Sequence, residues 1–188
     1  DRMLDIGFRP DIERILSSIS RKDRQTLLLS ATVPPSIERL ATRYMQEPTV
    51  LDFSKDAVSG DSIEQYYFSV DKAKKNELLQ RLIKRDEPEQ AIVFCRTRRG
   101  TDKLAKRLKE TFPNVGCIHG DMNQSVRDRV MKKFREERLK VLVATDVVGR
   151  GIDVSTISHI INFDTPEDCD DYVHRIGRTG RMGKEGVA

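Results

Sequence analysis

The sequence predicts an α/β fold in which a parallel sheet carries helices on both faces. From residue 63 onward, short apolar runs alternate with segments of helical periodicity, the pattern of successive strand–helix–strand units. The runs are apolar throughout, as strands are when both faces of a sheet are covered. The expected strands are residues 63–70, 91–96, 115–119, 140–145 and 157–163.

The segments between these strands place apolar residues three and four positions apart, which puts them on one stripe of a helix. The stripes are Leu78, Leu79, Leu82 and Ile83; Leu104, Ala105, Leu108 and Phe112; and Val126, Val130 and Phe134. We expect Asn123 and Thr165 to act as N-caps, with Pro166 in the first turn after Thr165.

Residues 1–53 repeat the pattern on a smaller scale, with two amphipathic helices and expected strands at 25–30 and 49–53. Two strands are too few for a stable open sheet, so we expect residues 1–53 to be the incomplete end of another α/β domain. Residues 54–62 are small, polar and glycine-containing, as linkers are. The predicted organisation is an incomplete domain at 1–53, a linker at 54–62 and a second domain at 63–188 that is truncated at its end.

Composition limits the classes of protein but does not identify a partner. The 34 basic and 30 acidic residues leave a net charge of +4, with basic residues concentrated at 98–110 and 127–140. These runs leave open a solvated helix face or a polyanion-binding surface. The three cysteines lie far apart with no CxxC pair, which favours reduced thiols over a zinc site. With no apolar run near the ~18 residues of a membrane helix and no leader, we expect a soluble, cytoplasmic protein.

The unusual loops all follow expected strands. They are RTRRG after strand 91–96, GDMNQ after strand 115–119, DVVGRGID after strand 140–145 and DTPED after strand 157–163. Ligands of open parallel sheets bind at the carboxyl ends of the strands. The sequence therefore predicts a ligand site where these loops meet.

Three short segments contain residue types suited to nucleotide chemistry. In ATDVVGRGID (144–153), two glycines allow backbone amides to approach an anion, and Asp153 suits ribose hydroxyls. A tight turn alone is the simpler explanation of those glycines. In HRIGRTGR (174–181), Arg178 and Arg181 are spaced to converge on a phosphate, with a solvated basic turn as the alternative. In SAT (30–32), Ser30 or Thr32 could simply cap the next helix.

Taken together, these segments resemble the DEAD-box family of RNA helicases, ATP-dependent enzymes with two RecA-like lobes. The similar motifs, in chain order, are SAT (30–32), IVFCRT (92–97), HGDMNQSVR (119–127), ATDVVGRGID (144–153) and HRIGRTGR (174–181). DRMLDIGF also resembles the residues after DEA, which makes Asp1 the last letter of the name motif. The resemblance spans nearly the whole chain and implies a RecA-like second lobe preceded by part of the first.

The resemblance implies a role for each matching residue. Arg178 and Arg181 correspond to arginine fingers that reach the γ-phosphate of ATP, Asp153 and Gly151 lie at the nucleotide, and His174 links this motif to the SAT and DEAD loops. Asp1, Ser30 and Thr32 belong to the catalytic motifs of the first lobe, with Asp1 near Mg²⁺ only when the upstream acids are present. The implied RNA-backbone contacts are Arg96, Thr97, Gly120, Gln124, Arg127, Thr145, Asp146 and Gly149.

The function implied is that of an ATP-dependent RNA helicase, which clamps RNA through its sugar-phosphate backbone and separates strands locally. No GxxxxGK[ST] phosphate loop occurs in these 188 residues, so we expect this chain alone to be inactive while its parent enzyme uses ATP with Mg²⁺. A DNA helicase or translocase of the same superfamily and a non-enzymatic RNA-binding lobe are the alternatives. Backbone contacts do not identify the RNA substrate.

Overall fold

The computed structural model describes residues 8–20, 24–30, 33, 35–51, 62–149, 152–181 and 183–188. The chain divides into two compact units, residues 1–58 and residues 59–188, and each is described by itself. Of the expected linker at 54–62, only Ser62 lies within the described residues.

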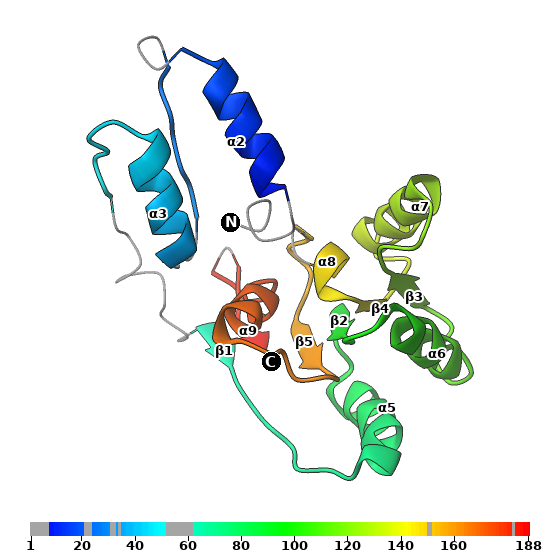
Figure 1. Ribbon diagram of the computed structural model, residues 1–188. Helices are drawn as coiled ribbons and strands as arrows, with labels where there is room; N and C mark the ends of the chain where they lie inside the picture. Colours follow the sequence, from blue (N-terminus) through cyan, green and yellow to red (C-terminus); the bar gives the residue numbers. More distant parts are fainter. Residues whose placement is uncertain are drawn as a thin grey trace. The chain divides into compact units, whose positions relative to one another are not determined.

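The described residues of the first unit form the helices α2 (Arg9–Ser18) and α3 (Pro35–Tyr44), as their apolar spacing predicts (Figure 1). The structure does not confirm the predicted strands: residues 25–30 and 49–51 belong to no strand, and residues 52–53 lie outside the described residues. A strand needs a hydrogen-bonded neighbour. The described part of this unit provides none, and Leu27 and Leu29 are 78% and 87% exposed.

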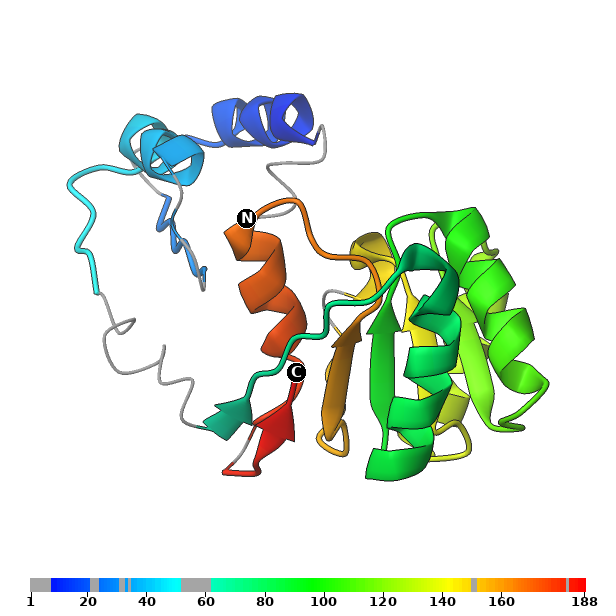
Figure 2. The same ribbon diagram turned by 90° about the horizontal axis from the view of Figure 1, so that it is seen from below.

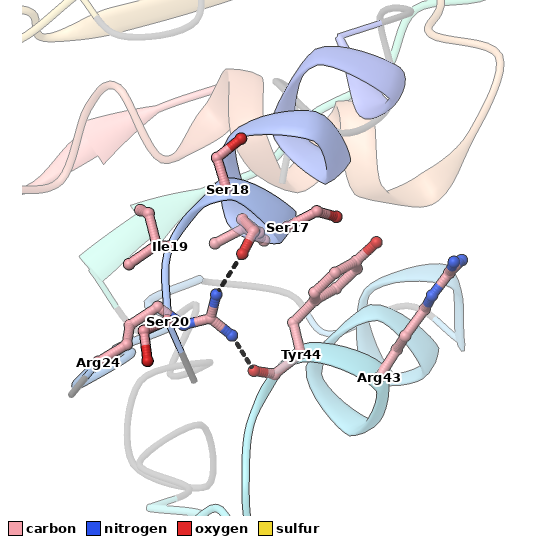
Figure 3. A pocket seen from close by; sticks show the side chains of 8 residues that line it. Ser17, Ser18, Ile19, Ser20, Arg24, Arg43 and Tyr44 are labelled. Carbon is pink, nitrogen blue, oxygen red and sulfur yellow. Dashed lines mark hydrogen bonds between the residues drawn. The ribbon is translucent and has the colours of Figure 1, made fainter. Parts of the chain in front are cut away.

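Arg24 connects the ends of the two helices in this unit. Its guanidinium donates to the carbonyl of Leu16 at 2.6 Å and to that of Tyr44 at 2.7 Å (Figure 3). These groups line a hollow of about 650 Å³ together with Ser17, Ser18, Ile19, Ser20 and Arg43. The hollow contains none of the site residues predicted from sequence.

The second unit is built on a six-stranded sheet with strand order β1-β6-β5-β2-β4-β3 (Figure 1). Every strand pair is parallel, which confirms the predicted sheet type. The strands are β1 (Ile63–Glu64), β2 (Ala91–Phe94), β3 (Val115–Ile118), β4 (Val141–Ala144), β5 (His159–Asn162) and β6 (Gly186–Val187). The predicted strand at 63–70 is too long, because pairing with β6 ends at Glu64.

Helices cover both faces of this sheet, as predicted (Figure 2). The helices of this unit are η2 (Lys72–Lys74), α5 (Lys75–Asp86), α6 (Arg98–Lys109), α7 (Gln124–Arg135), α8 (Asp146–Gly149) and α9 (Cys169–Ile176). Leu79 of α5 and Leu108 of α6 pack with Val93 and Val143 in one apolar cluster. Phe134 of α7 packs with Phe94 in another. Alternate residues of the central strands point to opposite faces, so each strand contributes to both clusters.

The two predicted N-caps have different outcomes. Asn123 does precede α7, although its side chain makes no capping hydrogen bond. The prediction for Thr165 is wrong, because α9 begins at Cys169 and is capped by Asp168, whose carboxylate accepts from the Asp171 amide at 2.6 Å. The Thr165 carbonyl accepts from Arg96 instead, which holds the segment outside the helix.

Candidate functional site

Four neighbouring strands of the sheet end at the same level. In the strand register, Ala144 of β4 pairs with Phe94 of β2 and Ile118 of β3, and Phe94 also pairs with Asn162 of β5. The loops that follow these strands therefore leave the sheet at one edge. Most of the site residues predicted from sequence belong to these loops or to the helices that follow them.

The loop after β2 is held by its own side chains and by the loop after β5. Thr97 caps α6, since its hydroxyl accepts from the Gly100 amide at 3.0 Å. The Arg96 amide donates to the Asp164 carboxylate at 3.0 Å, and its exposed guanidinium donates to the Thr165 carbonyl at 3.4 Å. The Arg96 guanidinium thus lies at the edge of the sheet with its backbone fixed.

The loop after β3 leads through Gly120 into α7, whose first turn contains Gln124 and Arg127. The Arg127 guanidinium donates to the Gln124 side-chain carbonyl at 3.1 Å. An ion pair between Arg98 and Asp121 joins this loop to the start of α6. The first-turn amides of a helix favour a phosphate at this position.

The loop after β4 contains Thr145, Asp146 and Gly149. The Gly149 amide donates to the Thr145 carbonyl at 2.8 Å. A Cβ atom at Gly149 would overlap the Phe94 ring, so only glycine allows α8 to lie this close to β2.

Three polar atoms of these loops are buried without a hydrogen-bond partner in the described part of the chain: Nδ1 of His119, Nε of Arg127 and Oγ1 of Thr145. A buried polar atom without a partner costs about 1–3 kcal/mol. Because these atoms are buried, a ligand with phosphate or hydroxyl oxygens can reach them only if their side chains rotate toward the surface.

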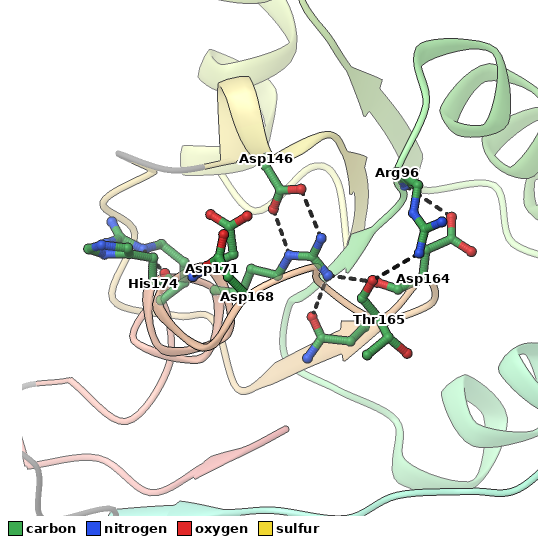
Figure 4. Close-up of polar contacts among 10 residues, drawn as sticks. Arg96, Asp146, Asp164, Thr165, Asp168, Asp171 and His174 are labelled. Atoms are coloured by element: carbon green, nitrogen blue, oxygen red, sulfur yellow. Dashed lines mark hydrogen bonds and ion pairs between the residues drawn. The ribbon is translucent and has the colours of Figure 1, made fainter. Parts of the chain in front are cut away.

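Arg175 of α9 connects the loops from the inside, with a side chain only 2% exposed. Its Nε and Nη2 donate to the two carboxylate oxygens of Asp146 at 2.6 and 2.8 Å (Figure 4). Its Nη1 donates to Oδ1 of Asn162 at 2.9 Å and to the Asp164 carbonyl at 2.7 Å. The guanidinium also lies 5.1 Å from the centre of the Phe94 ring. One buried cation thus joins α8, α9 and the ends of β2 and β5.

The two arginines implied by the resemblance to act at the nucleotide lie just beyond the end of α9, and Asp153 follows α8. Arg178 donates from Nε to the His174 carbonyl at 3.1 Å and from Nη1 to the Ile152 carbonyl at 3.2 Å. Arg181 donates from Nε to the Gly177 carbonyl at 2.8 Å and forms a 2.6 Å ion pair with Asp153, which is 86% exposed. The structure therefore brings Arg181 together with Asp153.

The turn between the two arginines depends on Gly180. Its φ of +65° lies in the left-handed region, and a Cβ atom there would lie 2.6 Å from Ile63. The neighbouring Thr179 is buried, and its hydroxyl donates to the Ile157 carbonyl at 2.6 Å. The turn is anchored to the sheet, which fixes where Arg178 and Arg181 leave the backbone.

The remaining predicted site residues lie outside this cluster. Ser30 is half-buried at the end of an extended segment in the first unit. Asp1, Thr32 and Gly151 lie outside the described residues.

Sequence reasoning missed Arg175 and Asp164. HRIGRTGR contains three arginines, and residue type alone does not show which one is buried. The DTPED loop was recognised as a site loop, but its first residue was not singled out. Asp164 accepts from both the Arg96 amide and Lys75, at 3.0 Å each.

The environment of Asp164 also determines its protonation. Burial raises the pKa of Asp164, but the hydrogen bonds from the Arg96 amide and the Lys75 ammonium outweigh that effect and bring the pKa below its ordinary value. Burial, together with the Asp164 carboxylate, raises the pKa of the nearby Cys95 thiol to about 12. Cys95 is therefore an unreactive core residue.

Within the described residues, no group of three or more histidine, cysteine and acidic side chains is arranged to hold a metal ion. No helix of that part of the chain has the length and apolar character needed to span a membrane.

The comparisons with known proteins define the class. Residues 74–183 match the helicase conserved C-terminal domain, and residues 1–40 match the DEAD/DEAH box helicase domain. The first match covers more than half of the chain, and the chain belongs to the DEAD-box helicase family.

Among curated relatives, the chain is 48% identical over 188 residues to the DEAD-box ATP-dependent RNA helicase CshA of Geobacillus kaustophilus and 47% identical to that of Bacillus subtilis. Each alignment includes 100% of this chain but only 40% and 38% of the two relatives, so the chain spans about two fifths of their length.

Two solved structures have the same fold. The chain matches S. cerevisiae Dbp5 bound to RNA and ADP BeF3 with a TM-score of 0.88 and 34% identity, covering 99% of this chain and 49% of that one. It matches a DEAD box protein from Methanococcus jannaschii with a TM-score of 0.65 and 41% identity, covering 99% and 50%. The RecA-like fold predicted from the motifs is confirmed.

Replacing Arg175 with methionine should lower the free energy of unfolding by about 3–5 kcal/mol, because the half-buried Asp146 carboxylate and the carbonyl oxygens of Asn162 and Asp164 lose their donor. Denaturant unfolding followed by circular dichroism measures the change. The control is Arg135→Met on the exposed side of α7, expected to change stability by less than about 0.5 kcal/mol. Equal stability of the two variants would contradict the role assigned to Arg175.

Replacing Asp164 with asparagine should cost about 1 kcal/mol at pH 7, allowing for its partial exposure. The folded-state pKa of Asp164 lies below its ordinary value of 3.8, so its charged form stabilises the fold above about that pH. That contribution is lost as the pH falls through the folded-state pKa. Unfolding measured from pH 7 to pH 3 should show the two proteins converging, and a constant difference would show that the carboxylate charge is not responsible.

Proposed function

We propose that the edge of the sheet formed by the ends of β2, β3 and β4 binds the sugar-phosphate backbone of RNA. The observation that carries the proposal is the common level of these strand ends, because the candidate RNA residues belong to the three segments that follow them along one edge. Those residues are Arg96, Thr97, Gly120, Gln124, Arg127, Thr145, Asp146 and Gly149. The unpartnered buried atoms of Arg127 and Thr145 support the proposal, since phosphate and 2′-hydroxyl oxygens would satisfy them once those side chains rotate toward the surface.

Asp146 has a different part in this site from the other residues. Both of its carboxylate oxygens accept from Arg175. We therefore assign it the task of presenting the backbone of the loop after β4 to RNA. Contacts to phosphate and sugar carry little sequence information, so binding should be salt-dependent and largely independent of sequence.

The second part of the proposal concerns a nucleotide. Two guanidiniums and an exposed carboxylate are the groups that phosphate oxygens and ribose hydroxyls require, which fits Arg178, Arg181 and Asp153 to a nucleoside triphosphate. ATP with Mg²⁺ would supply the phosphoryl group whose transfer to water releases free energy. Arg178 and Arg181 would stabilise its developing charge. Gly151 would lie close to the nucleotide, and His174 would link this segment to the first lobe.

The Arg181–Asp153 ion pair has a consequence for this assignment. The 2.6 Å contact uses the carboxylate that would accept from the ribose and one donor of the guanidinium that would meet phosphate. Both partners are accessible enough to rearrange, so the pair is a modest obstacle of about 1 kcal/mol or less. Nucleotide binding would exchange it for two contacts to the ligand.

The whole-protein activity that we propose is ATP-dependent unwinding of RNA duplexes in the cytoplasm. Residues 63–188 would be its second RecA-like lobe, 54–62 its linker and 1–53 the end of its first lobe, to which Asp1, Ser30 and Thr32 belong. Closure of two such lobes over ATP would bend the bound strand and separate it locally from its complement. A DNA helicase of the same superfamily is the alternative, and affinities for RNA and DNA of identical sequence distinguish the two.

The 188-residue chain alone should show no RNA-stimulated ATP hydrolysis. Its sequence contains no GxxxxGK[ST] loop to hold the β- and γ-phosphates. A phosphate-release assay with and without single-stranded RNA checks this. Turnover that rises with RNA would refute the expected need for a phosphate loop supplied by a longer protein.

In a longer protein that supplies that loop, Arg178→Ala should reduce RNA-stimulated ATP hydrolysis by about 10³-fold or more, because the guanidinium acts on transition-state charge. RNA affinity without nucleotide should change little. The matched control is Arg135→Ala, an exposed arginine outside the nucleotide segment, with turnover close to that of the unmodified enzyme. Turnover that survives the loss of Arg178 would remove this residue from the proposed mechanism.

A further inference from the structure

Lys75 contacts the loop after β5, next to the proposed RNA edge, although it lies outside every motif that carries the family resemblance. Its Nζ lies 3.0 Å from Oδ1 of Asp164 and 4.3 Å from the centre of the Phe163 ring. The Lys75 and Asp164 side chains are only 27% and 31% exposed. A carboxylate and an aromatic face thus hold the ammonium in one place.

The register of α5 sets the position of this ammonium. Leu79 and Ile83 follow Lys75 by one and two helical turns, and both are buried against the sheet. Residues four apart lie on the same face of a helix. Packing of α5 therefore directs Lys75, at its first turn, toward the sheet side and the end of β5.

Asp164 transmits this contact to the loop after β2. While Oδ1 receives Lys75, Oδ2 accepts from the Arg96 amide at 3.0 Å. The backbone of Asp164 is itself held, because its amide donates to the Phe94 carbonyl at 3.1 Å and its carbonyl accepts from Arg175 at 2.7 Å. The one remaining freedom is rotation of the carboxylate, and Lys75 restricts it.

We propose that Lys75 is a positioning residue for RNA binding, which acts through Asp164 to fix the backbone of Arg96 and Thr97. The inference rests on the proposed function, since it needs Arg96 and Thr97 to contact RNA. Lys75 itself does not touch the RNA. If the loop after β2 were flexible, ordering it would cost free energy when RNA binds. The Lys75–Asp164 pair orders this loop before binding and so avoids that cost.

The test measures the affinity of the 188-residue chain for a fluorescent single-stranded oligouridylate by anisotropy at low salt. Lys75→Met should weaken binding about threefold to tenfold, the size typical of residues that act through a neighbour. Lys72→Met is the matched control, because it removes the same charge from the exposed helical turn just before α5. Lys75→Arg should keep most of the RNA affinity of the unmodified chain, since a guanidinium can also pair with Asp164. Thermal unfolding of each variant confirms that it is folded at the assay temperature.

A double-mutant cycle separates positioning from direct contact. If Lys75 acts through Asp164, Lys75→Met should have little further effect in an Asp164→Ala background. An undiminished effect in that background would mean that Lys75 meets the RNA directly and would overturn the proposal, as would equal affinities of the Lys75→Met and Lys72→Met variants.

A chain that does not bind RNA, or whose affinity is unchanged by Arg96→Ala, would overturn the proposed RNA site and this inference together. Weakening by Arg96→Ala but not by Lys75→Met overturns this inference alone.

Discussion

The arrangement of the site depends on one buried cation. The Arg175 guanidinium has almost no access to water, so the hydration it lost must be replaced by the protein. Asp146 replaces it with two hydrogen bonds, and Asn162 and the Asp164 carbonyl complete the shell. Every one of these partners lies just after a strand or at its end. The need to satisfy one charge therefore brings the loop after β4, the end of β5 and helix α9 into a single arrangement.

The two proposed binding regions inherit their geometry from that arrangement. α9 holds Arg175 on its buried side and leads directly into the turn that presents Arg178 and Arg181. The loop after β4 meets the same guanidinium through Asp146 and contributes Thr145 and Gly149 to the proposed RNA edge. A displacement of α9 would disturb the contact between Arg175 and Asp146. The segment proposed to bind nucleotide and the loop after β4 are therefore connected through this ion pair. The tight fit of Gly149 against Phe94 leaves little room for α8 to adjust independently.

A second layer of contacts lies outside this shell. Asp164 meets Arg175 through its backbone, and Arg96 and Lys75 through its side chain. The contact with Arg175 belongs to the buried core, and the contacts with Arg96 and Lys75 belong to the accessible edge. This gradation from buried to exposed is what a binding site requires, because the inner contacts preorganise the loops while the outer groups remain able to meet a ligand.

The sequence by itself determined the parallel sheet, its helices and the loops that form the site. Strand and helix periods follow from the apolar residues along the chain, and loops after parallel strands share one edge whatever their sequence. Local pattern failed at residues 25–30 and 49–51, because a strand exists only when another strand pairs with it, and at Thr165, because Asp168 caps α9 instead.

Only the tertiary structure decided which charged residues are buried. Arg175, Arg178 and Arg181 are chemically identical, yet the first is enclosed by Asp146, Asn162 and Asp164 while Arg181 pairs with the exposed Asp153. Lys75 lies far from Asp164 in the chain and reaches it only because α5 packs on the sheet. The partners of a charge come from distant segments, and their distances are set by packing, which no local sequence pattern contains.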